Sequence, residues 1–336
     1  MAFELPGHFV WDFWLAHNGG DFHLYFLAAP RANEHPDLRH PRASIHHASS
    51  SNLMDWSYHG VAIAPSPEPA WDDCATWTGS VIRRPDGAWK MFYTGVTRKE
   101  ACRIQRIGAA ISTDLHHWTK VAGNPMIELS GETYERYDPK RWHDQAFRDP
   151  WVYRDPGGPG WRMLFTARDP HRPAKGAGVI GQACSPDLVN WTLGEPLYRA
   201  DHYGEMEVPQ LFALDGWWYC LFSNSVRHRE PSYVDGGRAG PVTGTHYLRS
   251  TSPHGPFALV EEEFFAGDPT GLLYGGRAVD TGRGHHVLMT FLNHKSDGSF
   301  IGTLSDPMPL RTTPEGYLRV DASRYGLSLP QTRNRS

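Results

Sequence analysis

A short turn sequence recurs along the chain and constrains the fold more than any other feature. Each copy begins with serine, continues through residues typical of turns and ends in an aromatic side chain. The four copies are Ser51–Trp56, Ser112–Trp118, Ser185–Trp191 and Ser252–Phe257, and a weaker fifth copy at Ser305–Leu310 lacks the aromatic residue. Their closing aromatics are 62, 73 and 66 positions apart. A recurrence at this spacing indicates a fold made of repeated supersecondary units.

A short segment rich in aromatic residues precedes each copy, and turn sequences such as Pro85-Asp86-Gly87 introduce several of these segments. The segments span residues 23–27, 89–93, 161–165, 217–222 and 286–291. We therefore predict an all-β fold of five small sheets arranged radially, a five-bladed β-propeller in which each blade packs on its neighbours. No linker or shift in composition divides the sequence, which predicts one domain over residues 1–336.

The composition excludes several classes of function. A formal net charge of −4 gives no basic field, so we do not expect a nucleic-acid partner. The N-terminal sequence lacks the basic and apolar regions of a signal peptide, and no apolar run approaches the length that crosses a membrane. The sequence therefore predicts a cytoplasmic protein with no membrane partner, and it does not predict an oligomeric state.

Neither the cysteines nor the histidines form a recognised metal-binding pattern. The four cysteines are widely spaced and lie beside apolar residues, so we predict that all of them are buried free thiols. They are Cys74, Cys102, Cys184 and Cys220. Adjacent pairs such as His46-His47 and His116-His117 chelate poorly because neighbours on a strand point to opposite faces. We predict no catalytic metal ion and no cofactor, while the sequence leaves a structural cation at the propeller axis open. We interpret the glycine-rich segment 236–240 as an insertion between strands rather than a phosphate loop.

Three acidic residues lie in segments bounded by aromatic residues or proline rather than on charged faces. They are Asp12 in Phe9–Trp14, Asp149 in Phe147–Pro150 and Glu207 in Glu207–Pro209. Burying a carboxylate in apolar surroundings is costly unless it has a partner or a task. Each segment precedes the aromatic strand of its repeat, so in a propeller all three would converge on the axis, where the innermost strands meet. Two carboxylates that flank a glycosidic bond can split its hydrolysis into two easier steps.

Three uncharged residues near these acids are candidates for contacts with a sugar. Trp11 and Trp77 offer aromatic faces on which the apolar face of a sugar ring stacks. Ser80 follows Gly79, where the backbone can approach a ligand closely, and it offers a hydroxyl group.

Two charged residues complete the predicted binding set. Arg148 would keep the neighbouring Asp149 ionised and could donate to a sugar hydroxyl. Glu205 lies two positions before Glu207 and therefore on the same face of a strand, where it competes for the same acid/base role. We predict that Glu205 binds substrate or supports Glu207.

These motifs resemble those of glycoside hydrolase clan J, the five-bladed propellers of families 32 and 68. Phe147–Pro150 matches the Arg-Asp-Pro motif of both families, and Glu207–Pro209 matches a Glu-Cys-Pro type motif with valine for cysteine. Trp11–Trp14 is closer to the Trp-Asp-x-Trp of family 68 than to the Asn-Asp-Pro-Asn-Gly of family 32, which is absent. The likeness runs from about Val10 to about Val320. Because the chain ends without room for the C-terminal β-sandwich of typical family 32 enzymes, we expect a propeller without that domain.

The resemblance implies a retaining double displacement on a β-fructofuranoside, such as sucrose or a short fructo-oligosaccharide. It makes Asp12 the nucleophile, Asp149 the stabiliser of the transition state and Glu207 the general acid/base. A retaining mechanism predicts that the carboxyl groups of Asp12 and Glu207 lie roughly 5–5.5 Å apart.

Other functions are compatible with the same three acids. A fructosyltransferase of the levansucrase type would move the sugar onto an acceptor other than water. The related propellers of family 43 also use two Asp and a Glu, which leaves an arabinofuranosidase-like hydrolase open. A non-catalytic sugar-binding propeller is a further alternative, and it would tolerate the loss of one acid. A scaffold for protein partners is the last alternative, and it would not require carboxylates at the same position of the repeat in three blades.

Overall fold

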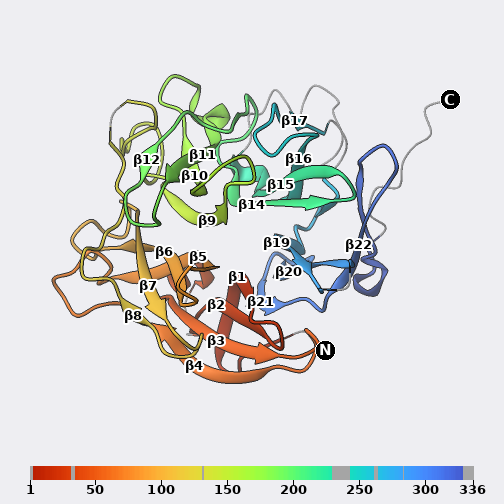
Figure 1. Ribbon diagram of the computed structural model, residues 1–336, viewed down its shortest axis with the longest axis horizontal. Coiled ribbons are helices and arrows are strands. Elements are labelled where there is room, and N and C mark those ends of the chain that lie inside the picture. The colour runs from red at the N-terminus through yellow and green to blue at the C-terminus, as the bar shows by residue number, and fades with distance from the viewer. Residues whose placement is uncertain are drawn as a thin grey trace.

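The computed structural model describes residues 3–31, 35–130, 132–228, 243–260, 264–282 and 284–327, which form five antiparallel sheets around a central axis (Figure 1). In each sheet the first strand lies nearest the axis, and the following strands are paired outward from it. The prediction of an all-β, five-bladed β-propeller is confirmed.

Each blade is built from strands that are consecutive in sequence. Blade one contains β1 (His8–His17), β2 (Phe22–Pro30), β3 (Ser44–Ser50) and β4 (Ser57–Ile63). Blade two contains β5 (Ala75–Arg83), β6 (Trp89–Val96), β7 (Arg106–Ser112) and β8 (Thr119–Lys120). Blade three contains β9 (Arg148–Arg154), β10 (Trp161–Arg168), β11 (Gly178–Ser185), β12 (Thr192–Leu193) and β13 (Tyr198–Arg199). Blade four contains β14 (Glu207–Leu214), β15 (Trp217–Asn224), β16 (Thr243–Ser250), β17 (Ala258–Leu259) and β18 (Ala266–Asp268). Blade five contains β19 (Leu273–Asp280), β20 (His286–His294), β21 (Phe300–Leu304), β22 (Met308–Thr312) and β23 (Leu318–Val320).

The repeats found in the sequence occupy equivalent positions in the blades. The aromatic segments form the second strand of every blade, and the repeated turn joins the third strand to the fourth in blades one to four. In blade two, Asp114 accepts hydrogen bonds from two backbone N–H groups of the turn, both at 2.8 Å, and Leu115 has a positive φ of 67°. Asp187 and Leu188 repeat this geometry in blade three, with a φ of 64°.

The turn leucines of blades two and three attach each of these two blades to the one before it. Leu115 and Leu188 are both buried. The carbonyl of Leu115 accepts a hydrogen bond from the hydroxyl of Tyr25 in blade one at 2.7 Å. The carbonyl of Leu188 accepts a hydrogen bond from Nζ of Lys90 in blade two at 2.6 Å. Because each bond links the second strand of one blade to the turn of the next, the repeated sequence encodes the contact between blades.

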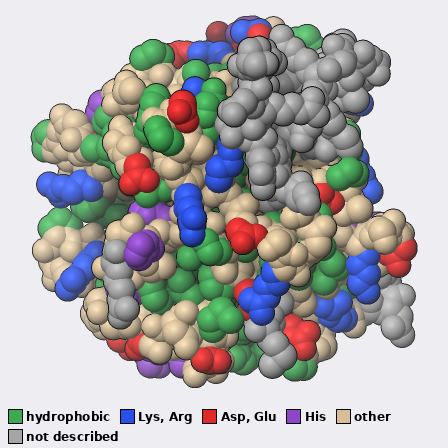
Figure 2. Space-filling model, turned by 90° about the vertical axis from the view of Figure 1, so that its right-hand side faces the viewer, with side chains coloured by type: hydrophobic (Ala, Val, Ile, Leu, Met, Phe, Trp, Pro, Cys, Tyr) green, Lys and Arg blue, Asp and Glu red, His purple; other side chains and the backbone are tan. Residues whose placement is uncertain are grey.

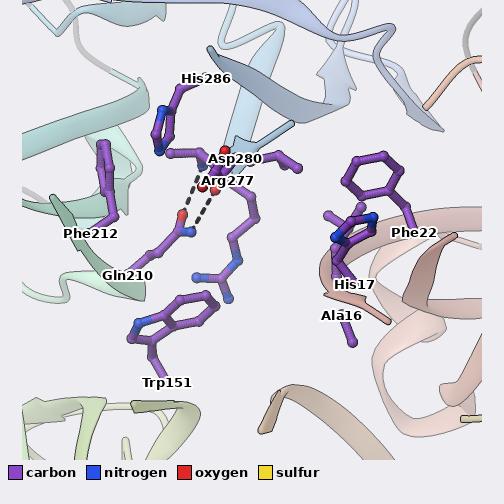
Figure 3. Close-up of a pocket in the computed structure, with 12 residues that line it drawn as sticks. Ala16, His17, Phe22, Trp151, Gln210, Phe212, Arg277, Asp280 and His286 are labelled. Carbon is purple, nitrogen blue, oxygen red and sulfur yellow. Dashed lines mark hydrogen bonds between the residues drawn. The ribbon is translucent and has the colours of Figure 1, made fainter. Parts of the chain in front are cut away.

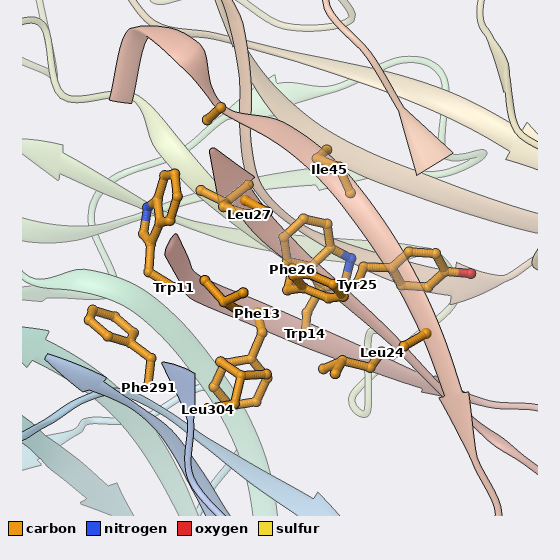
Figure 4. Close-up of a cluster of buried hydrophobic side chains, with 14 of the residues drawn as sticks. Trp11, Phe13, Trp14, Leu24, Tyr25, Phe26, Leu27, Ile45, Phe291 and Leu304 are labelled. Atoms are coloured by element: carbon orange, nitrogen blue, oxygen red, sulfur yellow. The ribbon is translucent and has the colours of Figure 1, made fainter. Parts of the chain in front are cut away.

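Aromatic side chains fill the space between the blades. Figure 4 shows the cluster at blade one, where Trp14, Tyr25 and Phe26 are completely buried and Phe291 of blade five is a neighbour. Burying a large apolar side chain contributes roughly 1.5–3 kcal/mol relative to leaving it exposed. The high aromatic content is therefore used mainly for packing of the ring, and it holds the inner strands in place around the axis.

Outside the sheets, the described residues form only four short 3-10 helices, and none is long and apolar enough to cross a membrane. They are η1 (Pro36–Arg42), η2 (Ala174–Gly176), η3 (Val226–His228) and η4 (Ser323–Tyr325). The glycine-rich segment 236–240 lies outside the described residues. On the side of the ring shown in Figure 2, basic and acidic side chains are interspersed, in agreement with the net charge of −4.

The prediction of four buried free thiols is wrong for three of the cysteines. Cys74 lies just before β5 and Cys102 lies after β6, so the hairpin brings them together, and they form a disulfide. Cys220 is free and buried as predicted, whereas Cys184 is free but exposed. Disulfides persist mainly in oxidising compartments. The disulfide therefore does not support a cytoplasmic location, which stays a prediction.

Removing this disulfide is expected to lower the stability of the propeller. The bond joins residues separated by 28 positions, and the chain-entropy model assigns a loop of this size roughly 3–4 kcal/mol. We expect the double variant Cys74→Ser/Cys102→Ser to lose about 2–4 kcal/mol in the free energy of unfolding, measured by urea denaturation. Cys184→Ser, which removes an exposed free thiol, is the control and should change stability little. An equal loss of stability in the double variant and in Cys184→Ser would contradict the assignment of a disulfide between Cys74 and Cys102.

Candidate active site

The site residues are placed by an irregularity that recurs in the innermost strands. The pairing of β1 with β2 shifts register between Trp11 and Phe13, so that Asp12 is an extra residue. The pairing also shifts in the inner strand of each other blade, and the shifts involve Thr78 in β5, Asp149 in β9, Val208 in β14 and Gly275 in β19. A bulge bends a strand and redirects its side chains, and bulges are frequent beside active sites. Each of the five blades therefore contributes a bulged segment of its inner strand to the site.

The bulged segments line one cavity of about 470 Å³. The three predicted catalytic acids lie in its wall, and each comes from a different blade. Of the predicted binding residues, the wall also includes Trp11, Trp77, Arg148 and Glu205. The structure therefore brings together all of the candidate residues except Ser80.

Ser80 connects two blades instead of facing the cavity. Its hydroxyl accepts a hydrogen bond from the backbone N–H of Val152 at 3.0 Å, and the residue is 1% exposed. The bulge in β5 explains the difference, because one extra residue changes which side chains of the strand face the axis. Thr78 is the residue that reaches the acids, so the position of Ser80 does not support the predicted contact with a sugar.

Asp12 is costly to ionise in this environment. Its Oδ2 accepts a hydrogen bond from Oγ1 of Thr78 at 2.7 Å. Burial raises the pKa of Asp12 to about 7, and the negative charges of Asp149 and Glu207 add to the shift. A carboxylate that is poorly stabilised as an anion gains more from attack on an electron-poor carbon than a well-solvated one does. The surroundings of Asp12 therefore suit a nucleophile.

Asp149 is more enclosed, with 2% of the residue exposed. Its carboxylate accepts hydrogen bonds from the hydroxyl of Thr166 at 2.7 Å and from the backbone N–H of Val208 at 3.1 Å. Burial raises its pKa, and the neighbouring Arg148 opposes that shift. Asp149 and Val208 have positive φ angles of 61° and 55°, which non-glycine residues seldom adopt. The bond between them holds two strained bulges of adjacent blades together.

Arg148 joins the two glutamates of blade four. Its Nη2 lies 2.9 Å from Oε2 of Glu205 and 2.8 Å from Oε1 of Glu207. The side chain of Glu207 is 19% exposed toward the cavity, whereas that of Glu205 is 1% exposed and accepts a hydrogen bond from Trp142. Burial alone would raise the pKa of Glu205, but Arg148 and His228 outweigh burial and hold that pKa well below its usual range. A carboxylate held ionised delivers no proton, so the surroundings favour Glu207 over Glu205 as the general acid.

A protein-family model matches the part of the chain that carries two of the three acids. Residues 14–250, more than half of the chain, match the model described as glycosyl hydrolases family 32 N-terminal domain. The chain belongs to glycosyl hydrolase family 32. The matched range contains Asp149 and Glu207 and begins two positions after Asp12. This range agrees with the sequence motifs, because the motif around Asp12 departs from the family 32 pattern whereas those around Asp149 and Glu207 keep it.

Curated relatives of this family 32 protein include enzymes of plants and bacteria. An insoluble β-fructofuranosidase isoenzyme of Arabidopsis thaliana is 31% identical over 172 residues, which are 49% of this chain and 27% of the relative. A sucrose-6-phosphate hydrolase of Pediococcus pentosaceus is 30% identical over 207 residues, which are 60% of this chain and 36% of the relative. The family 32 chain therefore spans well under half the length of these curated relatives.

Solved structures share the fold of the family 32 chain over most of its length. Inulosucrase from Halalkalicoccus jeotgali bound to kestose has a TM-score of 0.77 at 22% identity and covers 94% of this chain and 87% of that chain. Bacillus subtilis levansucrase has a TM-score of 0.74 at 16% identity, with the same two coverages of 94% and 87%. At these identities the likeness establishes the propeller fold.

Blade five of the family 32 propeller supplies a site residue that the sequence did not single out. The hydroxyl of Tyr274 donates a hydrogen bond to Oε2 of Glu207. Burial and the negative charge of Glu207 raise the pKa of Tyr274 well above its usual value, so the phenol remains a neutral donor. The signal was present, because Tyr274 precedes the aromatic strand of its repeat as the three acids do.

Arg277 is a second residue that sequence reasoning missed. Its guanidinium donates to the carbonyl of Phe13 at 3.1 Å and to the two carbonyls of Val208-Pro209 at 3.1 and 2.9 Å. Figure 3 shows it beside Trp151 in a separate cavity of about 260 Å³. Burial lowers its pKa to about 10, and Asp149 opposes that shift. Arg277 thus ties the bulges of β1 and β14 to blade five and places a positive charge near the acids.

Two groups of side chains in the cavity are close enough to hold a metal ion. Both include Glu205, which is joined by His143 and Asp144 in one group and by Glu207 and His228 in the other. The carboxylate of Glu205 already pairs with the guanidinium of Arg148 at 2.9 Å. A divalent cation would lie beside this fixed positive charge, so the donor set does not fit a catalytic metal.

Proposed function

We propose that this family 32 propeller is a retaining glycoside hydrolase that acts on β-fructofuranosides such as sucrose or short fructo-oligosaccharides. The observation that carries the proposal is that three acids from separate blades share one cavity in unequal environments. Asp12 is costly to ionise, Asp149 is enclosed and hydrogen-bonded, and Glu207 reaches the cavity. The family and the names of the relatives support the substrate class.

In the proposed first step, Asp12 attacks the anomeric carbon of the fructosyl unit while Glu207 donates its proton to the leaving oxygen. The glycosidic C–O bond breaks, and an ester forms between the sugar and Asp12. The negative charge that develops on Glu207 is stabilised by Arg148 at 2.8 Å and by the hydroxyl of Tyr274. Asp149 accepts hydrogen bonds from sugar hydroxyls and stabilises the positive charge of the oxocarbenium-like transition state.

In the second step, Glu207 takes a proton from water, which attacks the anomeric carbon and releases Asp12 as a carboxylate. Two inversions at the same carbon give net retention. Glu207 ends the cycle protonated and Asp12 ends it ionised, so both groups return to their starting states. Attack by a sugar hydroxyl instead of water would give a longer oligosaccharide by the same route.

The covalent intermediate provides the direct test. We would mix the Glu207→Ala variant with fructosyl fluoride, a donor whose leaving group needs no proton, and examine the protein by mass spectrometry. We expect an increase in mass of one fructosyl unit, located on the peptide that contains Asp12. The double variant Asp12→Asn/Glu207→Ala is the control and should remain unmodified. A fructosyl unit on another residue would overturn the assignment of the nucleophile.

Transfer to a sugar is the second candidate, because solved structures named inulosucrase and levansucrase share this fold. The ratio of the two monosaccharides released from sucrose separates the candidates. Equal amounts of glucose and fructose indicate hydrolysis, whereas an excess of glucose with longer oligosaccharides indicates transfer. No turnover of sucrose or short fructo-oligosaccharides would direct the test to arabinofuranosides, and no turnover of those would favour a non-catalytic sugar-binding propeller.

A further inference from the structure

Three imidazoles meet at the junction of blades one and two, away from the catalytic cavity. His47 lies on β3, His59 lies on β4, and His116 lies in the repeated turn of blade two. One ring nitrogen from each lies within 4.8 Å of the other two. The ring centroids are 4.7 Å apart for His47 and His59, 4.9 Å for His47 and His116, and 4.8 Å for His59 and His116. The spacing is short enough for a single cation to contact all three.

A bulge brings the first two histidines to the same side of the sheet. In the pairing of β3 with β4, His47 lies opposite Gly60 and Ala48 lies opposite Tyr58, so His59 is the extra residue between them. A regular strand would alternate its side chains and turn one of the two histidines away. The bulge in an outer strand thus creates a juxtaposition that adjacent pairs such as His46-His47 do not offer.

The third histidine is held by the contact between the blades. The backbone N–H of His116 donates to Asp114 at 2.8 Å, which fixes the turn, and the carbonyl of Leu115 accepts a hydrogen bond from Tyr25 of blade one at 2.7 Å. The ring of His116 therefore approaches blade one on a backbone that is anchored on both sides. A ligand held by His116 together with His47 would bridge two blades.

The surroundings of these rings are those of metal ligands. One nitrogen of His47 lies 3.0 Å from Nδ1 of His23, and one nitrogen of His59 lies 2.7 Å from the hydroxyl of Ser49. Histidines that bind metals usually have such a partner on the second nitrogen, which fixes the tautomer and the orientation of the ring. His47 is buried, while His59 and His116 are exposed, so an ion can enter from solvent.

We propose that His47, His59 and His116 form a binding site for a transition-metal cation. The cation that we expect is Zn²⁺, and it would join blade one to blade two. Imidazole nitrogens suit Zn²⁺, Cu²⁺ and Ni²⁺, whereas Ca²⁺ and Mg²⁺ prefer oxygen ligands. Three protein nitrogens and a water molecule complete the tetrahedral shell of zinc. The site is structural, because it lies on outer strands and a turn and contains none of the three acids.

The test uses zinc alone on the full chain, expressed without a polyhistidine tag and freed of metal with a chelator. We expect one equivalent of Zn²⁺ to bind in calorimetry and the Tm to rise by roughly 3 °C or more at saturating zinc. Mg²⁺ at the same concentration should leave the Tm unchanged. Hydrolysis of fructosides is measured in parallel and should not depend on zinc, which separates this proposal from the proposed function.

Two exposed ligands allow a matched pair of variants. In His59→Gln/His116→Gln we expect zinc affinity to fall at least 100-fold and the zinc-dependent rise in Tm to vanish, because second and third ligands are lost. Without zinc the variant should melt close to wild type, since both side chains are exposed. His285→Gln removes an exposed histidine from blade five and should retain wild-type binding. Equal zinc binding by the double variant and wild type, or no binding by wild type, would overturn the proposal.

Discussion

Replacing Asp12 with asparagine is expected to abolish turnover of fructosides and, above neutral pH, to make the fold more stable. The loss of turnover should be roughly 10⁴-fold or more in kcat, as for other residues that bond covalently to substrate. The gain in stability follows from the raised pKa of Asp12, because an ionised carboxylate is unfavourable beside Asp149 and Glu207. Asparagine keeps an acceptor for the hydroxyl of Thr78 and carries no charge.

The sign of the effect with pH makes this prediction specific. The folded pKa of Asp12, about 7, lies above its ordinary value of 3.8, so the folded state retains a proton that the unfolded state loses between these two values. Wild-type stability from this group is complete below about 3.8 and lost as the pH rises through about 7. The shift corresponds to at most roughly 4 kcal/mol, and we expect roughly 1–3 kcal/mol because the residue is partly exposed to the cavity.

Urea unfolding at pH 5 and pH 8 measures the effect. Asp12→Asn should exceed wild type in free energy of unfolding at pH 8 and differ much less at pH 5, where Asp12 of the wild type keeps its proton. Asp21→Asn, at an exposed position that follows the same strand, is the control and should alter neither activity nor stability. A stability gain of equal size at both pH values would show that the charge of Asp12 is not its cause.

The blades were predictable from sequence because their signals are local. The repeated turn depends on a few consecutive residues, such as Ser112, Asp114 and Leu115, whose hydrogen bonds are formed within the turn. An aromatic strand precedes this turn in each of blades one to four. The order of segments within the repeat placed Asp12, Asp149 and Glu207 on inner strands without knowledge of any distance between them.

The bulges are the reason why the sequence does not predict which side chains of the inner strands face the site. One extra residue in β5 turns Thr78 toward the acids and Ser80 toward blade three, and no residue pattern in the strand announces that shift. The bulge at His59 likewise assembles a cluster that the alternation rule excludes. Bulges depend on how a strand pairs with its neighbour, and that information is spread over two segments of the chain.

The other features that were not predicted from the sequence are contacts between residues that are far apart in the chain. Tyr274 and Arg277 contact residues of blades one and four that are 67 to 264 positions away in the chain. Cys74 and Cys102 meet because they flank a hairpin, which becomes evident only when the ends of β5 and β6 are known. In each case the sequence gives the residue type, whereas the partner depends on where the strands end, for the cysteines, or on the closure of the ring, for Tyr274 and Arg277.

Replacing Arg148 with methionine is expected to give the largest loss of stability among single changes at the site. The guanidinium lies 3.5 Å from Asp144, 3.6 Å from Asp149, 2.9 Å from Glu205 and 2.8 Å from Glu207. Its positive charge opposes the rise in pKa that burial causes in Asp144, Asp149 and Glu205. Removing one partner of a buried ion pair costs roughly 3–5 kcal/mol, because the remaining charge is left uncompensated.

The loss should grow with pH. Without Arg148 the opposing influence on Asp149 and Glu205 disappears, and burial then raises the pKa of both carboxyl groups. The variant can protonate them below their raised pKa values and recovers part of its stability there. At higher pH the carboxylates repel one another, so the free energy of unfolding falls relative to wild type. Turnover should also fall, since Glu207 loses the partner that stabilises its anion in the first step.

Two further variants separate the role of Arg148 from that of an ordinary ion pair. Arg148→Lys keeps the charge but loses the fork that reaches both Glu205 and Glu207, so we expect an intermediate loss. Arg162→Met breaks the pair with Asp155 at 2.7 Å near the surface and should cost roughly 0–1 kcal/mol. Equal losses in Arg148→Met and Arg162→Met, or a loss that does not vary between pH 5 and pH 8, would contradict the assignment of Arg148 as the cation that compensates the four carboxylates around it. The expected order of stability, with the methionine variant below the lysine variant and the lysine variant below wild type, would instead show that one guanidinium stabilises the carboxylates that surround it.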